Sequence, residues 1–182
     1  IVEQTVVIKP KMNFTPSREG KKYFVKTFGC QMNEHDSEKI AGMFELDGMT
    51  KATLEDSADI MFINTCTIRE NADDRLYGTL GQLKKWKDEG IDRKLLVGGC
   101  AAQKDKELVR ERAPWVDVVI GTHNLTNIIN LLNQSEDWGP ITEIIDEIED
   151  LPTDAPSIRE SEHSAWLTIQ IGCNNSCTFC IV

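Results

Sequence analysis

The chain has 182 residues, of which 40% are hydrophobic and 27% are charged, and this composition supports a packed core and excludes a disordered chain. The formal net charge of −10 argues against a main nucleic-acid-binding surface, because such a surface needs clustered Lys and Arg. No apolar run reaches the ~18 residues of a membrane span, and residues 1–4 lack the charged head and apolar stretch of a signal peptide, so we expect a cytoplasmic protein.

The first half of the chain alternates predicted strands and helices. Residues 1–21 are polar and contain proline, which predicts an extended N-terminal arm with solvated basic side chains. Residues 23–28 predict a strand, and a helix follows from about residue 33 or 36 to Gly48. The apolar run 60–63 predicts a second strand. A capping-box pattern at Thr67 then predicts a helix that ends near Gly90.

The same alternation continues through the middle of the chain. Residues 94–97 and 116–120 predict two further buried strands, and residues 103–112 predict the helix between them. The apolar residues of 125–132 recur at helical spacing after the last of these strands. Strands alternating with helices predict an α/β domain with a doubly wound, mainly parallel sheet of the flavodoxin or Rossmann type over residues 22–133.

Beyond this domain the sequence becomes acidic and contains three prolines, so residues 134–164 are interpreted as a linker with some docking against the domain. Periodicity does not decide between a helix and a strand for residues 141–148. Residues 165–171 predict a strand, and the chain stops eleven residues later. We therefore expect residues 165–182 to be the truncated start of a second domain.

Three of the six cysteines recur at matching positions of the predicted βα units. Cys30, Cys66 and Cys100 each follow a predicted strand and precede a helix, and we call them the strand-end cysteines. Ligands of open parallel sheets bind at this edge, so these thiols are expected to share a metal or cluster site. Glycines nearby would allow close backbone approach, and helix dipoles would favour thiolates over thiols.

The chemistry of the strand-end cysteines has two interpretations. Three thiolates suggest a [4Fe-4S] cluster with one open iron. A zinc site completed by His35 or by water is the alternative. His35, His123 and His163 are otherwise expected to be ordinary polar residues.

The other three cysteines lie close together near the C-terminus. Cys173, Cys177 and Cys180 have the spacing C-x3-C-x2-C, with Phe179 before the last, and we call them the C-terminal cysteines. Three thiolates on one loop can hold three irons of a four-iron cluster and leave the fourth open to a cofactor. A zinc knuckle lacking its fourth ligand is the weaker interpretation.

These motifs together resemble a known family, the radical S-adenosylmethionine methylthiotransferases. The C-terminal cysteines resemble the signature at the first strand of the radical S-adenosylmethionine barrel. The N-terminal domain of the family is similar to three segments of this chain: Thr27-Phe-Gly-Cys-Gln-Met-Asn33 with Asp36-Ser-Glu38, Asn64-Thr-Cys-Thr-Ile-Arg69 and Gly98-Gly-Cys-Ala-Ala-Gln103. Residues 29–33 are most similar to the branch that acts on isopentenylated adenosine in tRNA. The branches acting on a ribosomal protein or on threonylcarbamoyl-adenosine usually differ there.

The resemblance, which covers about residues 22–182, implies a two-cluster enzyme. Cys173, Cys177 and Cys180 would hold the [4Fe-4S] cluster whose open iron binds S-adenosyl-L-methionine. Cys30, Cys66 and Cys100 would hold the auxiliary [4Fe-4S] cluster that carries the sulfur. The product would be a methylthio group at C2 of N6-isopentenyladenosine beside the tRNA anticodon. Implied partners are tRNA, bound mostly by absent C-terminal parts, and an electron donor such as flavodoxin or ferredoxin.

Other classes of protein remain open from the residues alone. A non-catalytic iron-sulfur or zinc module would need no reductant, and a methylthiotransferase for another substrate would share the motifs. A flavodoxin-like carrier would need a flavin-phosphate loop after the first strand, and residues 29–33 are poor in the Ser, Thr and Gly expected there. We expect a monomer that is inactive as this fragment, with no membrane contact.

Overall fold

The structure, a computed structural model, describes residues 15–67, 72–90, 92–146, 156–159 and 163–169, with Ser176 and Thr178, although not the side chain of Ala72. Within this part of the chain one sheet contains six strands: β1 (Lys22–Phe28), β2 (Thr50–Lys51), β3 (Ile60–Thr65), β4 (Lys94–Gly98), β5 (Val118–Ile120) and β6 (Ile141–Glu143). All neighbouring pairs are parallel, in the order β2-β1-β3-β4-β5-β6. The prediction of a parallel α/β sheet is confirmed.

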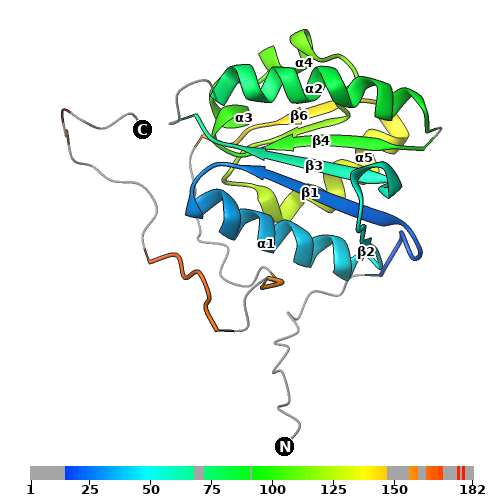
Figure 1. Ribbon diagram of the computed structural model, residues 1–182, viewed down its shortest axis with the longest axis horizontal. Coiled ribbons are helices and arrows are strands. Elements are labelled where there is room, and N and C mark those ends of the chain that lie inside the picture. The colour runs from blue at the N-terminus through cyan, green and yellow to red at the C-terminus, as the bar shows by residue number, and fades with distance from the viewer. Residues whose placement is uncertain are drawn as a thin grey trace, which may run out of the picture.

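Helices cover both faces of this sheet (Figure 1). The described helices are α1 (Gln31–Leu46), α2 (Ala72–Asp88), α3 (Cys100–Asp105), α4 (Leu108–Arg112) and α5 (Ile128–Trp138), with the 3-10 turns η1 (Glu55–Ser57) and η2 (Leu125–Asn127). One core lies between the sheet and α1 with α5, and a second lies between the sheet and α2, α3 and α4. The fold is therefore doubly wound, as expected.

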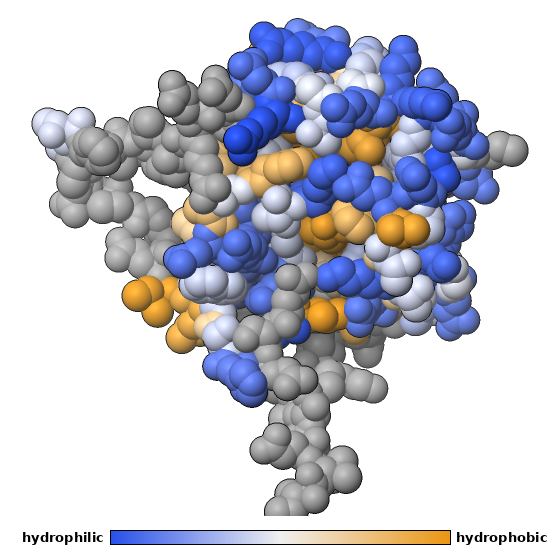
Figure 2. All heavy atoms as spheres, viewed as in Figure 1, coloured by the Kyte–Doolittle hydropathy of each residue, from blue (hydrophilic) through white to orange (hydrophobic). Residues whose placement is uncertain are grey.

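The central strands are apolar along their whole length because both of their faces are covered. Every residue of β3 is buried. Met61 and Ile63 point into the core beneath α2, whereas Ile60 and Phe62 point into the core beneath α1. This two-sided burial explains why the strand sequences do not alternate between apolar and polar residues. The outer surface in Figure 2 is mostly hydrophilic by contrast.

The structure adds one unexpected strand to the sheet and decides between the two alternatives for residues 141–143. The short strand β2 was not expected, and residues 141–143 of the ambiguous 141–148 segment form β6, while 147 and 148 lie outside the described residues. The chain moves from β1 to β2 and from β5 to β6 in opposite directions across the sheet, yet α1 and α5 cover the same face. These two crossovers therefore have opposite hand, which is rare for parallel strands.

The helix expected over residues 103–112 is two short helices. Helix α3 ends at Asp105 and α4 begins at Leu108. Between them Lys106 has a φ of 49°, a left-handed conformation that breaks the run of helical hydrogen bonds. The side chain of Lys106 forms an ion pair with Asp146 at 2.9 Å, which ties this break to the segment after β6.

The expectation of solvated basic side chains in the N-terminal arm is wrong for Arg18, whereas residues 15–17, 19 and 20 are exposed. Arg18 is only 6% exposed and forms ion pairs with the buried Asp47 at 2.5 Å and with Glu136 at 2.9 Å. Ser17 donates two hydrogen bonds to the same Asp47 carboxylate. The arm is therefore fixed to the C-terminal ends of α1 and α5.

The strand expected over residues 165–171 is not formed by its described part. Residues 163–169 contain no strand, while 170 and 171 lie outside the described residues. Leu167 and Ile169 are largely exposed, and hydrophobic side chains are visible on this segment in Figure 2. A strand needs a neighbour for its backbone hydrogen bonds, and no described segment pairs with this one.

No helix in the described ranges is both long enough and apolar enough to span a membrane.

Candidate functional site

The three central strands bring the strand-end cysteines to one edge of the sheet. Cys66 directly follows β3, while Cys30 and Cys100 each lie two residues beyond the ends of β1 and β4. The register pairs Phe28 with Thr65 and Asn64 with Gly98, so the three strands end at the same level. The sequence prediction that these residues meet at the carboxyl edge therefore agrees with the fold.

Two of these cysteines flank the point where the strand order reverses. From β1 the chain first moves to β2 and later returns to β3 on the other side of β1. Cys30 follows β1 and Cys66 follows β3, on either side of this switch point. In doubly wound sheets the loops diverge there and leave room for a ligand.

A buried network of asparagine side chains supports the loops that carry Cys30 and Cys66. Asn33 accepts a hydrogen bond from the Cys30 backbone N–H at 3.2 Å and donates to Asn64 Oδ1 at 2.9 Å. Asn64 donates back to the Asn33 carbonyl at 2.7 Å and to Ser37 Oγ at 2.9 Å. Both asparagines are at most 1% exposed. The network fixes the loop after β1 against the end of β3.

Asn33 and Asn64 belong to the sequence motifs, but the sequence alone did not predict that they support the cysteine loops. The available signal was the polar Asn64 at the end of a strand that is otherwise apolar. A buried amide must find hydrogen-bond partners, so such a residue indicates a specific network.

Glycines leave the space that this arrangement needs. A Cβ on Gly29 would lie 2.1 Å from Asn33 Oδ1. A Cβ on Gly99, whose φ is +90°, would lie 2.4 Å from both Asn64 Oδ1 and the Thr65 carbonyl oxygen. These glycines therefore allow the loops before Cys30 and Cys100 to approach the asparagine network, as the sequence suggested.

The electrostatics of the site differ from the expectation for free thiolates. Burial, followed by negative charge on Cys66, Cys30 and Asp36, raises the pKa of Cys100 to about 11. Because these charges affect the pKa of Cys100, the side chains of Cys66, Cys30 and Asp36 lie near it. The net effect of burial and like charge favours the neutral thiol of Cys100 when no cation is bound, which differs from the thiolate expected from the sequence.

The number and spacing of possible ligands at the carboxyl edge decide which metal group could bind there. Among the described residues, no three His, Cys, Asp or Glu side chains are close enough to hold one metal ion. This arrangement does not fit the zinc site with His35, whose Nδ1 lies 3.9 Å from Glu38. A four-iron cluster binds each thiolate through a different iron, so its ligands lie further apart than the ligands of one ion. Three thiols over a glycine-lined edge fit such a cluster.

The structure describes only some of the remaining candidate residues. Cys173, Cys177, Cys180 and Phe179 lie outside the described residues. Within the described ranges, His123 and His163 are not part of any metal-binding group. Gln103, the last residue of its motif, accepts a hydrogen bond from the Thr122 backbone at 3.2 Å and donates to the Ile145 carbonyl at 3.0 Å.

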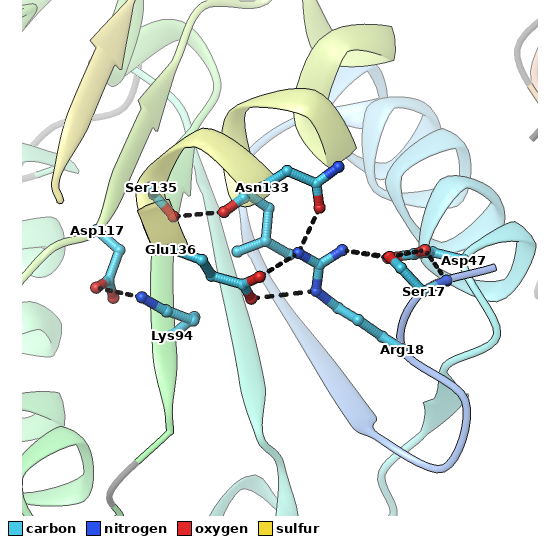
Figure 3. A network of polar contacts seen from close by, with 9 residues as sticks. Ser17, Arg18, Asp47, Lys94, Asp117, Asn133, Ser135 and Glu136 are labelled. Atoms are coloured by element: carbon cyan, nitrogen blue, oxygen red, sulfur yellow. Dashed lines mark hydrogen bonds and ion pairs between the residues drawn. The ribbon is translucent and has the colours of Figure 1, made fainter. Parts of the chain in front are cut away.

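A cavity of about 610 Å³ lies at the opposite, amino edge of the sheet. Its lining includes Arg18 and Lys94, whose side chains already form ion pairs with Asp47, Glu136 and Asp117 (Figure 3). Because these charges neutralise one another, the cavity is a less suitable ligand site than the thiol-bearing edge.

Comparisons with known proteins agree with the motifs. The family model described as "Uncharacterized protein family UPF0004" matches residues 22–121. The chain is 48% identical over 179 residues to the tRNA-2-methylthio-N(6)-dimethylallyladenosine synthase of Corynebacterium urealyticum, covering 98% of this chain and 33% of that protein. It is 53% identical to the protein of the same name from Tropheryma whipplei over 161 residues, covering 88% of this chain and 34% of that protein. The chain spans about a third of the length of the curated relatives it matches.

Proposed function

Because the chain belongs to the UPF0004 family, we propose that it is the N-terminal part of a radical S-adenosylmethionine tRNA methylthiotransferase. The enzyme would add a methylthio group to C2 of N6-isopentenyladenosine beside the anticodon, in line with the names of the relatives. The observation that carries the proposal is that Cys30, Cys66 and Cys100 lie at the carboxyl edge of the sheet, with Cys30 and Cys66 on either side of its switch point.

The strand-end cysteines are proposed to hold an auxiliary [4Fe-4S] cluster. Bound there, the cluster would supply the sulfur that is transferred. The chain itself positions the ligands, because hydrogen bonds of Asn33 and Asn64 fix the loops that carry Cys30 and Cys66. A positive cluster would also lower the pKa of Cys100, which favours the thiolate that coordination requires.

The C-terminal cysteines are proposed to hold a second [4Fe-4S] cluster. Cys173, Cys177 and Cys180 supply three thiolates within eight residues, which leaves one iron for S-adenosyl-L-methionine. The cofactor supplies the radical chemistry that an unactivated C–H bond requires.

The remaining expectations about partners and location follow from the same proposal. The target base must leave its stack to reach the cysteines, so the enzyme binds a flipped nucleotide of tRNA. An electron donor such as flavodoxin or ferredoxin reduces the second cluster. We propose that the protein acts in the cytoplasm as a monomer.

The test compares Cys66→Ala with Trp138→Ala in the full-length protein. Trp138 is 83% exposed at the C-terminal end of α5, away from the cysteines, so its loss leaves the site intact. After anaerobic reconstitution, iron is counted and methylthioadenosine is measured in tRNA digests with reductant and S-adenosylmethionine. We expect Cys66→Ala to lose about half of the iron, which is one of two clusters, and all of the product.

Two results would contradict the proposal. Unchanged iron content in Cys66→Ala would remove this residue from the cluster site. Tight zinc binding with no dependence on reductant would instead favour the non-catalytic zinc module.

A further inference from the structure

The described segment 156–159 lies against the outer side of α1, below the sheet in Figure 1. The backbone N–H of Ile158 donates a hydrogen bond to the carbonyl oxygen of Glu38 at 3.0 Å. Residues 147–155 and 160–162 lie outside the described part, so this contact joins two otherwise separate stretches. The segment is therefore held to the helix by its backbone.

A glycine of α1 makes the close approach possible. A Cβ on Gly42 would lie 2.5 Å from the carbonyl oxygen of Pro156 and 3.0 Å from the backbone nitrogen of Ser157. Glycine is unfavourable inside a helix, so a buried glycine at this contact needs a packing reason. The backbone of the docked segment supplies that reason.

The contacts also give the segment a direction. Pro156 lies at Gly42, and Ile158 lies one helical turn earlier at Glu38. A further turn back, the pKa of His35 is lowered by burial, then by the charge of Lys39 and by that of Arg159, which places Arg159 near His35. The segment thus runs antiparallel to α1, toward the helix start that directly follows Cys30.

We propose that residues 156–159 form a strap on α1, seated at Gly42, that holds the C-terminal cysteines within short reach of the strand-end cysteines. This role rests on the proposed function, in which both cysteine sets act on one base. Thirty residues separate Glu143 at the end of β6 from Cys173, but only 14 separate Arg159 from Cys173. Effective concentration falls with about the −3/2 power of tether length, so the strap raises it about threefold.

The test uses full-length protein with both clusters and compares three variants. Gly42→Leu places a side chain where the strap contacts α1. Ile158→Pro changes the strap itself, because proline has no N–H to donate to the Glu38 carbonyl. Gly81→Leu is the matched control, because Gly81 lies in α2 with no atom within 4 Å of an added Cβ. Hydrogen exchange of peptides covering residues 156–159 reports docking, and the single-turnover rate of tRNA methylthiolation reports positioning.

We expect exchange in residues 156–159 to rise about tenfold in Gly42→Leu and in Ile158→Pro, with iron content unchanged. The methylthiolation rate falls about threefold or more in both, and Gly81→Leu changes neither quantity. Unchanged exchange in Gly42→Leu would overturn the strap, and faster exchange with an unchanged rate would overturn its positioning role. If the unmodified protein forms no methylthioadenosine, the proposed function fails, while the exchange result still decides whether the strap exists.

Discussion

The two edges of the sheet both contain buried polar groups, but the groups are of different kinds. At the amino edge, charges pair with charges, and Arg18 alone binds Asp47, Glu136 and Asn133. At the carboxyl edge, neutral amides bind one another and hold backbone loops in place. The charged groups of the amino edge therefore neutralise one another, whereas the carboxyl edge has three cysteines at the ends of neighbouring strands.

The largest effect is expected when the amino edge is broken. Arg18→Met leaves the carboxylate of Asp47, which is 0% exposed, without its cationic partner. We expect a loss of about 4 kcal/mol in the free energy of unfolding, measured by urea titration. Iron bound after reconstitution, measured on the folded protein, stays unchanged because the cysteines lie at the other edge. A loss of iron in folded Arg18→Met would show that the two edges are coupled.

A glycine pair tests the carboxyl edge at constant backbone conformation. Gly99 and Gly139 have nearly identical angles, with φ of 90° and 91° and ψ of −173° and −171°. An added Cβ meets Asn64 and Thr65 at Gly99 but nothing within 4 Å at Gly139. We expect Gly99→Ala to cost about 2 kcal/mol more than Gly139→Ala, because only the former adds a clash to the backbone strain.

The same pair separates stability from ligand binding. Only Gly99→Ala is expected to lower the iron content, since only Gly99 adjoins the loop of Cys100. Equal destabilisation by the two variants, with equal iron content, would contradict the role assigned to the carboxyl edge.

The smallest expected effect concerns the one carboxylate coupled to the thiols. Burial raises the pKa of Asp36 from 3.8 to about 6, against the opposing charge of Lys39. A raised folded-state pKa stabilises the fold at low pH, and that contribution is lost as the pH rises through about 6. In metal-free protein, Asp36→Asn is therefore expected to match the parent near pH 4 and to exceed it by about 1.5 kcal/mol at pH 7.

Urea titrations at several pH values measure this difference. Asp92→Asn is the control, because it makes the same substitution at an exposed aspartate. A gain for Asp36→Asn that does not depend on pH would contradict the assignment.

Much of the sheet and the meeting of the strand-end cysteines were predictable because they depend on local patterns. Buried parallel strands are continuously apolar, and their carboxyl ends meet at one edge whatever the loop sequences are. Cys30, Cys66 and Cys100 could therefore be grouped from their positions in the repeated βα unit. The protonation of Cys100 could not, because it depends on burial and on charges brought in from other loops.

The features that the sequence did not predict depend on contacts between residues far apart in the chain. Strand β6 follows a crossover of the rare hand, and its Glu143 accepts hydrogen bonds from Asn124 and Asn127. The burial of Arg18 requires Asp47 and Glu136, which lie far along the chain. The apolar pattern of residues 165–169 gave no strand, because pattern alone does not supply a pairing partner.

The lengths of the two outermost strands bear on solubility during synthesis and storage. β2 has two residues and β6 has three, whereas the four strands between them include the most hydrophobic segments of the chain. Exposed strand edges are templates for aggregation, and short edges offer few backbone groups to a second molecule. A strongly apolar sheet is thus bordered by edges that offer few backbone groups to other copies, which disfavours polymerisation through its sides.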